Sequence, residues 1–550
     1  MLYLLALLAR LVVLAGFPDP AYPDSFYYVD VARQLAAGHG FSVDFVWIFV
    51  DVGAHIPANP VLPIASNAHW MPLASLIQVP FIWVLGPTAF ASGLPFVLIG
   101  SAAAPLTWAI GRDANLRPLV VLGAAVLAAV PGLLLVFMAQ PDNFALYQVL
   151  VAGSLWLASG GLRGSPWRFA ASGLLAGLAT LARTDGMLVL GVLGMVFLWD
   201  RWRSRRSLGT EPPRPAKIPL RAAIGAVALF ALAVGPWFAR QITVFGSMSP
   251  STATGKVLLI RNMSEWNSID TPASLDHLLG MGIGPLLATR VTGLVAAVVI
   301  FSIFIGVVAL MPPMLAGVWS RRRDTAFGAA FGFAAVLFAF SGTISSVHVS
   351  GGTFIHSAVG LAPHAYLLAI EGVVVLAAWA GRRRRGWDAE RAGRLIAAGA
   401  VAVGVIAAVA GTLIMDTSWN VKRERLLAVA AALDAAAVPA TDRVMSIDAS
   451  GTRYWTGRGG VVTVNDPITT VEKVANAYDI RWLVLERAEA VPAAVAILAG
   501  GPLPGWLGPP ILNLPDVKVY PVCTTVGDQR CAVAGVAPAA GVAPAAGVAP

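Results

Sequence analysis

Asp24 follows the first apolar segment directly, within the sequence YPDSFYY at 22–28. A carboxylate beside aromatic residues at the edge of a membrane segment has an unfavourable desolvation energy, which indicates a functional residue. Asp24 has the chemistry of a general base, which would take a proton from an acceptor hydroxyl. Alternatively, Asp24 caps the helix that follows, and the two roles are compatible. Asp30 and Arg33 are i,i+3 neighbours on that helix, which predicts a surface ion pair.

Asp142 is a second acid, in the turn AQPDN at 139–143 between two apolar segments. It either caps the next segment or supplies another carboxylate to the same cavity as Asp24. His69 lies in AHWMP before a short apolar stretch, and we expect it on the same side of the membrane as Asp24. His356 follows His348 by eight residues, a spacing that does not match metal ligands on one helical turn.

Basic residues are needed near these acids if the leaving group is a phosphate. Arg183 and Arg240 each end an apolar segment on the side where few bases are expected, and Lys256 follows in the next loop. Each arginine could instead snorkel or pair with an acid, which for Arg183 is Asp185. Together these residues favour an anion-binding site.

The composition is that of a polytopic membrane protein. Of the 550 residues, 57% are hydrophobic and 12% charged, with mean hydropathy +0.74, which excludes a soluble globular protein of this length. The net charge of +9 comes largely from short basic runs at 201–206, 321–323 and 382–385. Such runs between apolar segments indicate cytoplasmic loops rather than nucleic-acid binding.

Eleven apolar segments predict a membrane domain over residues 1–416. Basic loops on one side place the N-terminus in the cytoplasm, and an odd number of crossings places the C-terminus outside the plasma (inner) membrane. The outer loops are then 18–70, 240–286 and 346–356. Residues 72–86 are short and interrupted by proline and glycine, which favours a re-entrant or interfacial helix. The eleven segments are 1–17, 91–111, 117–137, 143–161, 167–183, 185–200, 218–239, 287–312, 325–345, 355–380 and 394–415.

Two charges inside these segments need partners. Arg10 either snorkels, faces a polar cavity or indicates that the true start lies upstream. Glu371 requires a buried partner that the sequence does not identify.

Residues 417–534 have the pattern of a small extracytoplasmic α/β domain. Short strands are predicted at 443–448, 461–464, 482–486 and 517–522, and helices at 425–437 and 469–478. Cys523 and Cys531 could pair outside the cell. The six-residue repeat at 535–550 predicts a disordered tail. The chain has no G-x-x-x-x-G-K-[ST], H-E-x-x-H or G-x-S-x-G motif, which argues against ATP hydrolysis and against the hydrolases with those motifs.

With these motifs in this order, the chain resembles the GT-C glycosyltransferases, polytopic enzymes that use polyprenyl-phosphate-linked sugars. It is most similar to the bacterial branch of aminoarabinose transferases and protein O-mannosyltransferase relatives. The family motif D-E-x-x-Y resembles Asp24 through Tyr28, with Ser25 replacing the second acid. The His/Pro signature resembles His69-Trp70-Met71-Pro72, and the P-D turn resembles Pro141-Asp142. Two further motifs resemble the segments 177–186 and 236–246.

The resemblance implies a GT-C-like fold and a single inverting displacement with Asp24 as general base and Asp142 as a second catalytic acid. It implies that Arg183, Arg240 and Lys256 bind the phosphate, and we assign Tyr28, His69 and His356 to substrate binding. The acceptor would be an extracytoplasmic glycan, lipid or protein. Some relatives use Mg²⁺ or Mn²⁺, but Ser25 in place of an acid favours metal independence.

A lipid-sugar flippase or transporter is the alternative function, because it too would place acids and bases along a path through the membrane. The chain has no repeat between its halves, and a long outer α/β domain is not expected of a transporter. Both observations favour the transferase.

Overall fold

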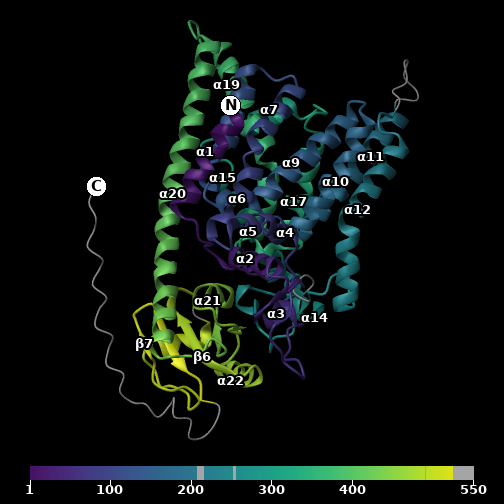
Figure 1. The fold of residues 1–550 in the computed structure, drawn as a ribbon. Coiled ribbons are helices and arrows are strands. Elements are labelled where there is room, and N and C mark those ends of the chain that lie inside the picture. The colour runs from purple at the N-terminus through teal and green to yellow at the C-terminus, as the bar shows by residue number, and fades with distance from the viewer. Residues whose placement is uncertain (207–215, 252–255, 490, 524–550) are drawn as a thin grey trace.

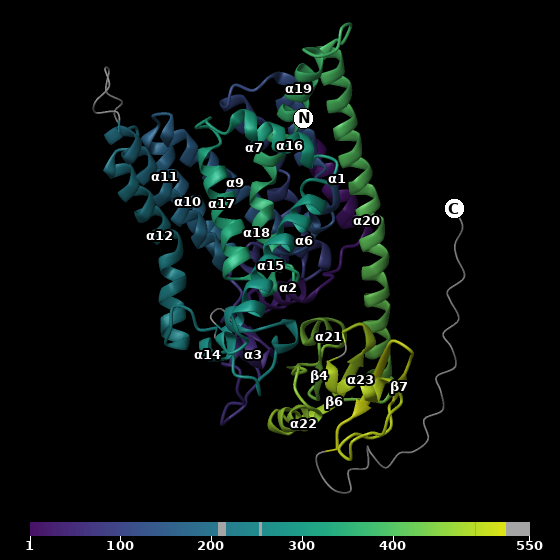
Figure 2. The ribbon, with the colours of Figure 1, turned by 180° about the vertical axis from the view of Figure 1, so that it is seen from behind.

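The computed structural model describes residues 1–206, 216–251, 256–489 and 491–523. It has a helical bundle with a mixed sheet at one end, and the N-terminus lies toward the other end of the bundle (Figure 1). The long helix α20 runs along one side of the bundle to the sheet, and α10 to α12 form the opposite side (Figure 1 and Figure 2). A Cys523–Cys531 pairing and the tail 535–550 fall outside the described residues.

The helices are numerous and of unequal length. In the first half they are α1 (Leu2–Gly16), α2 (Pro23–Ala36), α3 (Ile48–Asp51), α4 (Leu73–Leu76), α5 (Val79–Leu85), α6 (Ala89–Gly100), α7 (Ala103–Asp113), α8 (Pro118–Ala129), α9 (Asn143–Leu162), α10 (Pro166–Ala182), α11 (Met187–Arg206) and α12 (Leu220–Phe245). In the second half they are α14 (Leu275–Leu279), α15 (Ile283–Phe304), α16 (Met311–Arg321), α17 (Gly328–Thr343), α18 (Thr353–Ala358), α19 (Ala362–Gly381), α20 (Ala389–Ala435), α21 (Ala449–Thr456), α22 (Ile468–Ala477) and α23 (Pro492–Leu498).

The protein is an integral membrane protein. In the described part of the chain, six helical stretches are long and apolar enough to cross a membrane, and four apolar helices are shorter. The expectation of eleven separate spans is therefore confirmed only in part. The six long stretches are Ala89–Asp113, Asn143–Leu162, Leu220–Phe245, Ile283–Phe304, Thr353–Gly381 and Ala389–Ala435.

Prolines explain one difference from the expected segments. The segment expected at 287–312 divides into α15 and α16, and Pro312 and Pro313 stand in the first turn of α16. Proline has no N–H to continue the ladder of a preceding helix, but it is tolerated where a helix begins. The chain between the two helices makes a sharp turn in which Val307 and Val308 have positive φ.

The two charges inside the bundle have partners. Arg10 is fully buried, and its Nη1 donates to the carbonyl oxygens of Ala129 at 2.8 Å and Ala6 at 3.1 Å. The carbonyl groups at the C-terminal end of α8 have no hydrogen-bond donor within that helix, and lipid chains cannot supply one. Arg10 therefore supplies the donor for the Ala129 carbonyl. Glu371 accepts from Arg321 at 2.6 Å and 2.9 Å, which supplies the partner that the sequence required.

The sheet has six strands in the order β2-β5-β4-β6-β8-β7. The expected strands are confirmed as β4 (Arg443–Ser446), β5 (Gly460–Val462), β6 (Ile480–Glu486) and β8 (Val517–Pro521), and β7 (Leu512–Asn513) lies at one edge. At the other edge lies β2 (Phe45–Val46) from the first loop, parallel to β5. A separate ribbon pairs β1 (Ser42–Val43) with β3 (Ile64–Ala65). The expected helix at 425–437 is the end of α20, and that at 469–478 is α22.

Two glycines let the first loop join the sheet. A Cβ on Gly460 would lie 1.7 Å from the Val444 carbonyl oxygen, and one on Gly459 would lie 2.2 Å from the carbonyl oxygen of Asp44. Because no side chain fits, only glycine permits these backbones to approach so closely. The Gly460 N–H donates to that same Asp44 oxygen at 3.0 Å.

Helix α21 packs against α2, the helix that carries Asp24. The ring centroids of Tyr454 and Phe26 are 5.3 Å apart. The guanidinium carbon of Arg33 lies over the Tyr454 ring, 4.7 Å from the ring centroid. The Tyr454 hydroxyl donates to Asp19 at 3.2 Å. The predicted surface pair of Asp30 with Arg33 is wrong, because Asp30 is buried and Arg33 turns toward Tyr454.

Tyr454→Ala should therefore destabilise the first loop as well as the sheet. We expect a loss of roughly 2 kcal/mol from the aromatic and cation–π contacts of this half-buried ring, seen as a lower thermal unfolding midpoint in detergent. Tyr454→Phe keeps the ring and should lose at most about 1 kcal/mol. Equal midpoints for wild type and Tyr454→Ala would contradict this coupling.

Candidate active site

A cavity of about 620 Å³ lies where α2, the α10–α11 turn, α17 and α18 meet. It is lined by charged, aromatic and aliphatic residues from elements far apart in sequence. They are Tyr22, Pro23, Asp24, Tyr28, Trp47, Val50, His69, Trp70, Met71, Asn143, Ala182, Arg183, Thr184, Asp185, Met187, Leu188, Val257, Leu258, Met263, Trp266, Leu337, Phe340, Ser341, Ser345, His348, Val349, Gly351, Thr353, Phe354, His356 and Ser357.

Asp24 stands in the first turn of α2 and faces this cavity. The helix is capped by Ser25 instead, whose Oγ accepts from the N–H groups of Ala21 at 3.0 Å and Tyr22 at 3.1 Å. Ser25, the residue that replaces the family's second acid, thus has a local structural role. Asp24 Oδ1 accepts from Trp70 Nε1 at 2.9 Å. No donor reaches its Oδ2 from the described residues, so that oxygen is available to a ligand.

Asp142 caps the N-terminus of α9, which confirms the capping role, one of the two roles expected for it. It is fully buried, and its Oδ1 accepts from the Asn143 N–H at 2.5 Å. Its Oδ2 accepts from the Tyr22 hydroxyl at 2.9 Å and lies 3.2 Å from His356 Nε2. Asp142 is therefore behind the cavity wall, where it orients Tyr22 and His356, both of which line the cavity.

His356 makes polar contacts through both of its ring nitrogens. Nδ1 lies 2.9 Å from the carbonyl oxygen of Gly352, which can only accept, so Nδ1 carries a hydrogen in this contact. Nε2 lies 3.2 Å from the Asp142 carboxylate. The ring also stacks on Phe144 with centroids 3.9 Å apart.

The same three residues are placed to hold a metal ion. Ligand atoms of Asp24, Asp142 and His356 lie within 4.8 Å of one another. Two carboxylates and an imidazole suit Mn²⁺ or Zn²⁺ better than Mg²⁺, which prefers oxygen ligands throughout. Nε2 is the ring nitrogen of His356 that faces Asp142, so it is the nitrogen that would reach an ion held by these residues.

Arg183 is the one arginine or lysine among the described residues that line the cavity. It ends α10, and its Nε pairs with Asp185 Oδ1 at 3.1 Å, the partner expected from the sequence. Asp185 Oδ2 accepts in turn from the Ser357 hydroxyl. Burial is the largest single effect and acts to lower the pKa of Arg183, but Asp185 together with Tyr28, Tyr147 and Asp24 raises the pKa above its ordinary value. The guanidinium is thus a fixed positive charge.

Arg240 and Lys256 do not line the cavity. Arg240 donates to Gln241 at 2.8 Å and lies among the rings of Phe41, Trp237 and Phe245. Lys256 Nζ donates to the Gly53 carbonyl at 3.0 Å. Both side chains therefore hold loops beside the cavity, although Val257 and Leu258, directly after Lys256, do line it.

Tyr28 and His69 line the cavity as expected. The Tyr28 hydroxyl accepts from Asn143 Nδ2 at 3.2 Å, which connects α2 to the cap of α9. Burial, followed by the charge of Arg183, lowers the pKa of His69 to about 4, so its imidazole is neutral at pH 7. Trp70 lies in the motif His69-Trp70-Met71-Pro72 and holds Asp24, a role that no local sequence pattern predicted.

The two acids have pKa values that move apart. Burial and then the charge of Asp142 raise the pKa of Asp24 above 3.8, against opposing effects of His356, Trp70 and Arg183. Burial would also raise the pKa of Asp142, but hydrogen bonds from His356, Asn143 and Tyr22 hold it below 3.8. This separation of the two pKa values suits a pair in which Asp142 stays ionised while Asp24 is able to take up a proton.

Comparison with solved structures shows an ArnT-like fold, in agreement with the resemblance seen in the sequence. No protein-family model matches the sequence, and no curated protein matches it. The crystal structure of ArnT from Cupriavidus metallidurans bound to undecaprenyl phosphate matches with TM-score 0.55 and 13% identity, covering 94% of this chain and 97% of that one. The apo ArnT structure matches with TM-score 0.51 and 15% identity over the same shares. The mycobacterial arabinofuranosyltransferase AftD gives 0.45 and 15%, covering 95% of this chain and 41% of its own.

Asp142→Asn should lower the pKa of Asp24, because it removes a nearby like charge. In wild type the raised pKa favours the protonated carboxyl, so Asp24 should ionise at a higher pH than free aspartate. Infrared difference spectra should show a carboxylic C=O band that titrates above pH 3.8 and disappears in Asp24→Asn. The midpoint should fall in Asp142→Asn, and an unchanged midpoint would show that the two acids do not interact.

Proposed function

We propose that this protein is an inverting membrane glycosyltransferase that moves a sugar from a polyprenyl-phosphate donor to an extracytoplasmic acceptor. The observation that carries the proposal is the cavity in which the Asp24 carboxylate and the Arg183 guanidinium both face the same space. A base and a fixed cation in one cavity match the two ends of a displacement at a sugar phosphate. The ArnT-like fold supports this reaction class.

The transfer step begins at Asp24. Its open Oδ2 accepts the proton of the acceptor hydroxyl as the acceptor oxygen attacks the anomeric carbon. The bond between that carbon and the phosphate oxygen breaks, and the electron pair leaves with the polyprenyl phosphate. Trp70 holds Oδ1, which fixes the carboxylate against rotation away from the cavity.

Arg183 would stabilise the phosphate as its charge grows, an effect worth about 3 kcal/mol for one well-placed donor. Asp185 and Ser357 hold the guanidinium in place. The apolar side chains of Leu188, Leu337 and Phe340 line the same cavity and provide a surface for the prenyl chain. The neutral His69 imidazole can donate to or accept from a sugar hydroxyl without adding charge.

The reaction as proposed needs no metal. If an ion were bound, Asp24, Asp142 and His356 would hold it, and it would supply additional positive charge near the phosphate. However, both oxygens of Asp142 already accept hydrogen bonds from protein groups. This satisfied network supports metal independence, in agreement with Ser25 at the position of the family's second acid.

The orientation is part of the proposal. Arginines 382–385, between α19 and α20, lie at the end of the bundle away from the sheet, toward the N-terminus (Figure 1). By the positive-inside rule that end is cytoplasmic, and the cavity and sheet then face outward.

Asp24→Asn should abolish most of the transfer reaction. With purified protein, a panel of polyprenyl-phosphate sugars and a membrane extract as acceptor, wild type should release free polyprenyl phosphate. The variant should lose at least about 100-fold in rate, the size expected for a general base. Release at equal rates would move the base elsewhere, whereas movement of intact lipid-linked sugar across the bilayer without release would identify a flippase.

Arg183→Gln should raise KM for the donor about tenfold or more, because it removes the phosphate contact in the cavity, and it should also lower kcat, because that contact strengthens as the phosphate charge grows. Arg240→Gln is the matched control. It removes the same charge from a site outside the cavity and should change KM by no more than about twofold. Thermal unfolding of both variants checks that they fold. A large effect of Arg240→Gln alone would return phosphate binding to Arg240.

A further inference from the structure

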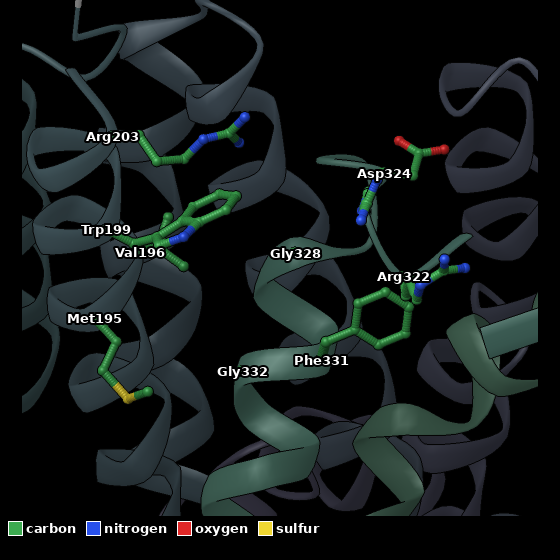
Figure 3. Close-up of a pocket in the computed structure, with 10 residues that line it drawn as sticks. Met195, Val196, Trp199, Arg203, Arg322, Asp324, Gly328, Phe331 and Gly332 are labelled. Atoms are coloured by element: carbon green, nitrogen blue, oxygen red, sulfur yellow. The ribbon is translucent and has the colours of Figure 1, made fainter. Parts of the chain in front are cut away.

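A second cavity, of about 440 Å³, lies between the other ends of the same two helices, α11 and α17. Residues early in α11 and late in α17, such as Leu188 and Leu337, line the active-site cavity. The second cavity is instead lined by residues late in α11 and early in α17. Figure 3 shows Trp199 and Arg203 of α11 facing Phe331 of α17 across it, with Arg322 at the far side.

The cavity brings together two basic runs that are far apart in sequence. Arg203 belongs to the run at 201–206, and Arg322 and Arg323 belong to the run at 321–323. The one lining carboxylate, Asp324, pairs at 3.3 Å with Arg321, a residue outside the lining that also pairs with Glu371. Neither Arg322 nor Arg323 makes a salt bridge within the described residues. The charges of Arg322 and Arg323 are therefore not balanced by Asp324, which leaves a net positive site on this side of the cavity.

Tryptophan–arginine pairs place this cavity at the membrane surface. At this end of the bundle, four guanidinium groups lie between 4.1 and 4.6 Å from the centroid of a tryptophan ring three or four residues earlier in the chain. Tryptophan collects at the level of lipid headgroups, and arginine above it reaches the phosphates. The pairs are Trp199–Arg203, Trp202–Arg206, Trp319–Arg322 and Trp379–Arg383.

Below the arginines the cavity is apolar. Met195, Val196 and Phe331 form this part of the lining, and Met195 is 49% exposed. Gly328 and Gly332 leave room on the facing helix, since a Cβ on Gly332 would already contact Val192 at 3.4 Å. The positively charged rim is complementary to the anionic phosphate of a phospholipid. The apolar floor below it has space for an acyl chain.

We propose that this cavity binds an anionic glycerophospholipid of the leaflet at the arginine-rich end. Its phosphodiester would lie among Arg203, Arg322 and Arg323, and one acyl chain would pass between α11 and α17 along Met195 and Phe331. Basic pockets between membrane helices are recognised sites for anionic headgroups. Because α11 and α17 also line the active-site cavity, the lipid would hold the spacing of these two helices from the opposite end.

The test uses the full-length protein in phosphatidylcholine nanodiscs, titrated with a photoreactive phosphatidylglycerol whose crosslinks are mapped by mass spectrometry. Crosslinks should fall on α11 and α17. The triple variant Arg203→Gln, Arg322→Gln, Arg323→Gln should weaken this labelling at least about tenfold. The matched control, Arg382→Gln, Arg383→Gln, Arg384→Gln, removes the same charge outside the cavity and should retain it.

A second variant tests the apolar floor without altering charge. Met195→Trp fills the space between the helices and should also reduce labelling, with an unfolding midpoint close to that of wild type. If both triple variants lost the same amount of labelling, the lipid would be attracted by general surface charge and not by this cavity, which would overturn the proposal. Equal labelling by photoreactive phosphatidylcholine, or displacement by inorganic phosphate at the same concentration, would also overturn the proposal.

Discussion

The active site depends on holding two carboxylates close together in a buried place where only one is fully compensated. Asp142 accepts from Tyr22 and Asn143 and contacts His356, whereas Trp70 is the one hydrogen-bond donor to Asp24 in the part of the chain that the structure describes. In a low-dielectric setting the fully hydrogen-bonded acid stays ionised, and its charge makes ionisation of the other more costly. This asymmetry separates a structural acid, Asp142, from the carboxylate that we propose as the base, Asp24. It arises because the cap of α9 meets the start of α2 and helix α18.

That arrangement requires support from outside the membrane domain. Helix α2 lies between the bundle and the sheet, and it is held from the sheet side by Tyr454 and by the Ser450 hydroxyl, which donates to the Pro23 carbonyl at 3.2 Å. The first loop also contributes β2 to the sheet itself. The C-terminal sheet is therefore joined to the helix that carries Asp24, and its contribution to the site is the position of that helix.

Helices α11 and α17 connect the two cavities. Each has one end at the acidic cavity and the other at the arginine-rich cavity. The proposed lipid would therefore act on the active-site cavity only through a change in the spacing of these two helices. Between these ends Val189, Val192 and Leu193 of α11 are buried, and no polar pattern in the sequence marked this pair of helices.

The sequence by itself determined the membrane class, the presence of acids at the ends of the segments and the strands β4, β5, β6 and β8, because these depend on local hydropathy and period. It also pointed to the Arg183–Asp185 pair, whose partners are two residues apart. Only the tertiary structure decided that His356 meets Asp142, that Trp70 holds Asp24, that β2 joins the sheet, and that Arg183 lines the cavity while Arg240 and Lys256 do not. Each of these contacts joins residues from separate elements, or depends on which way a side chain at a helix end turns. Hydropathy and spacing carry no information about either, since both are settled by how the helices pack.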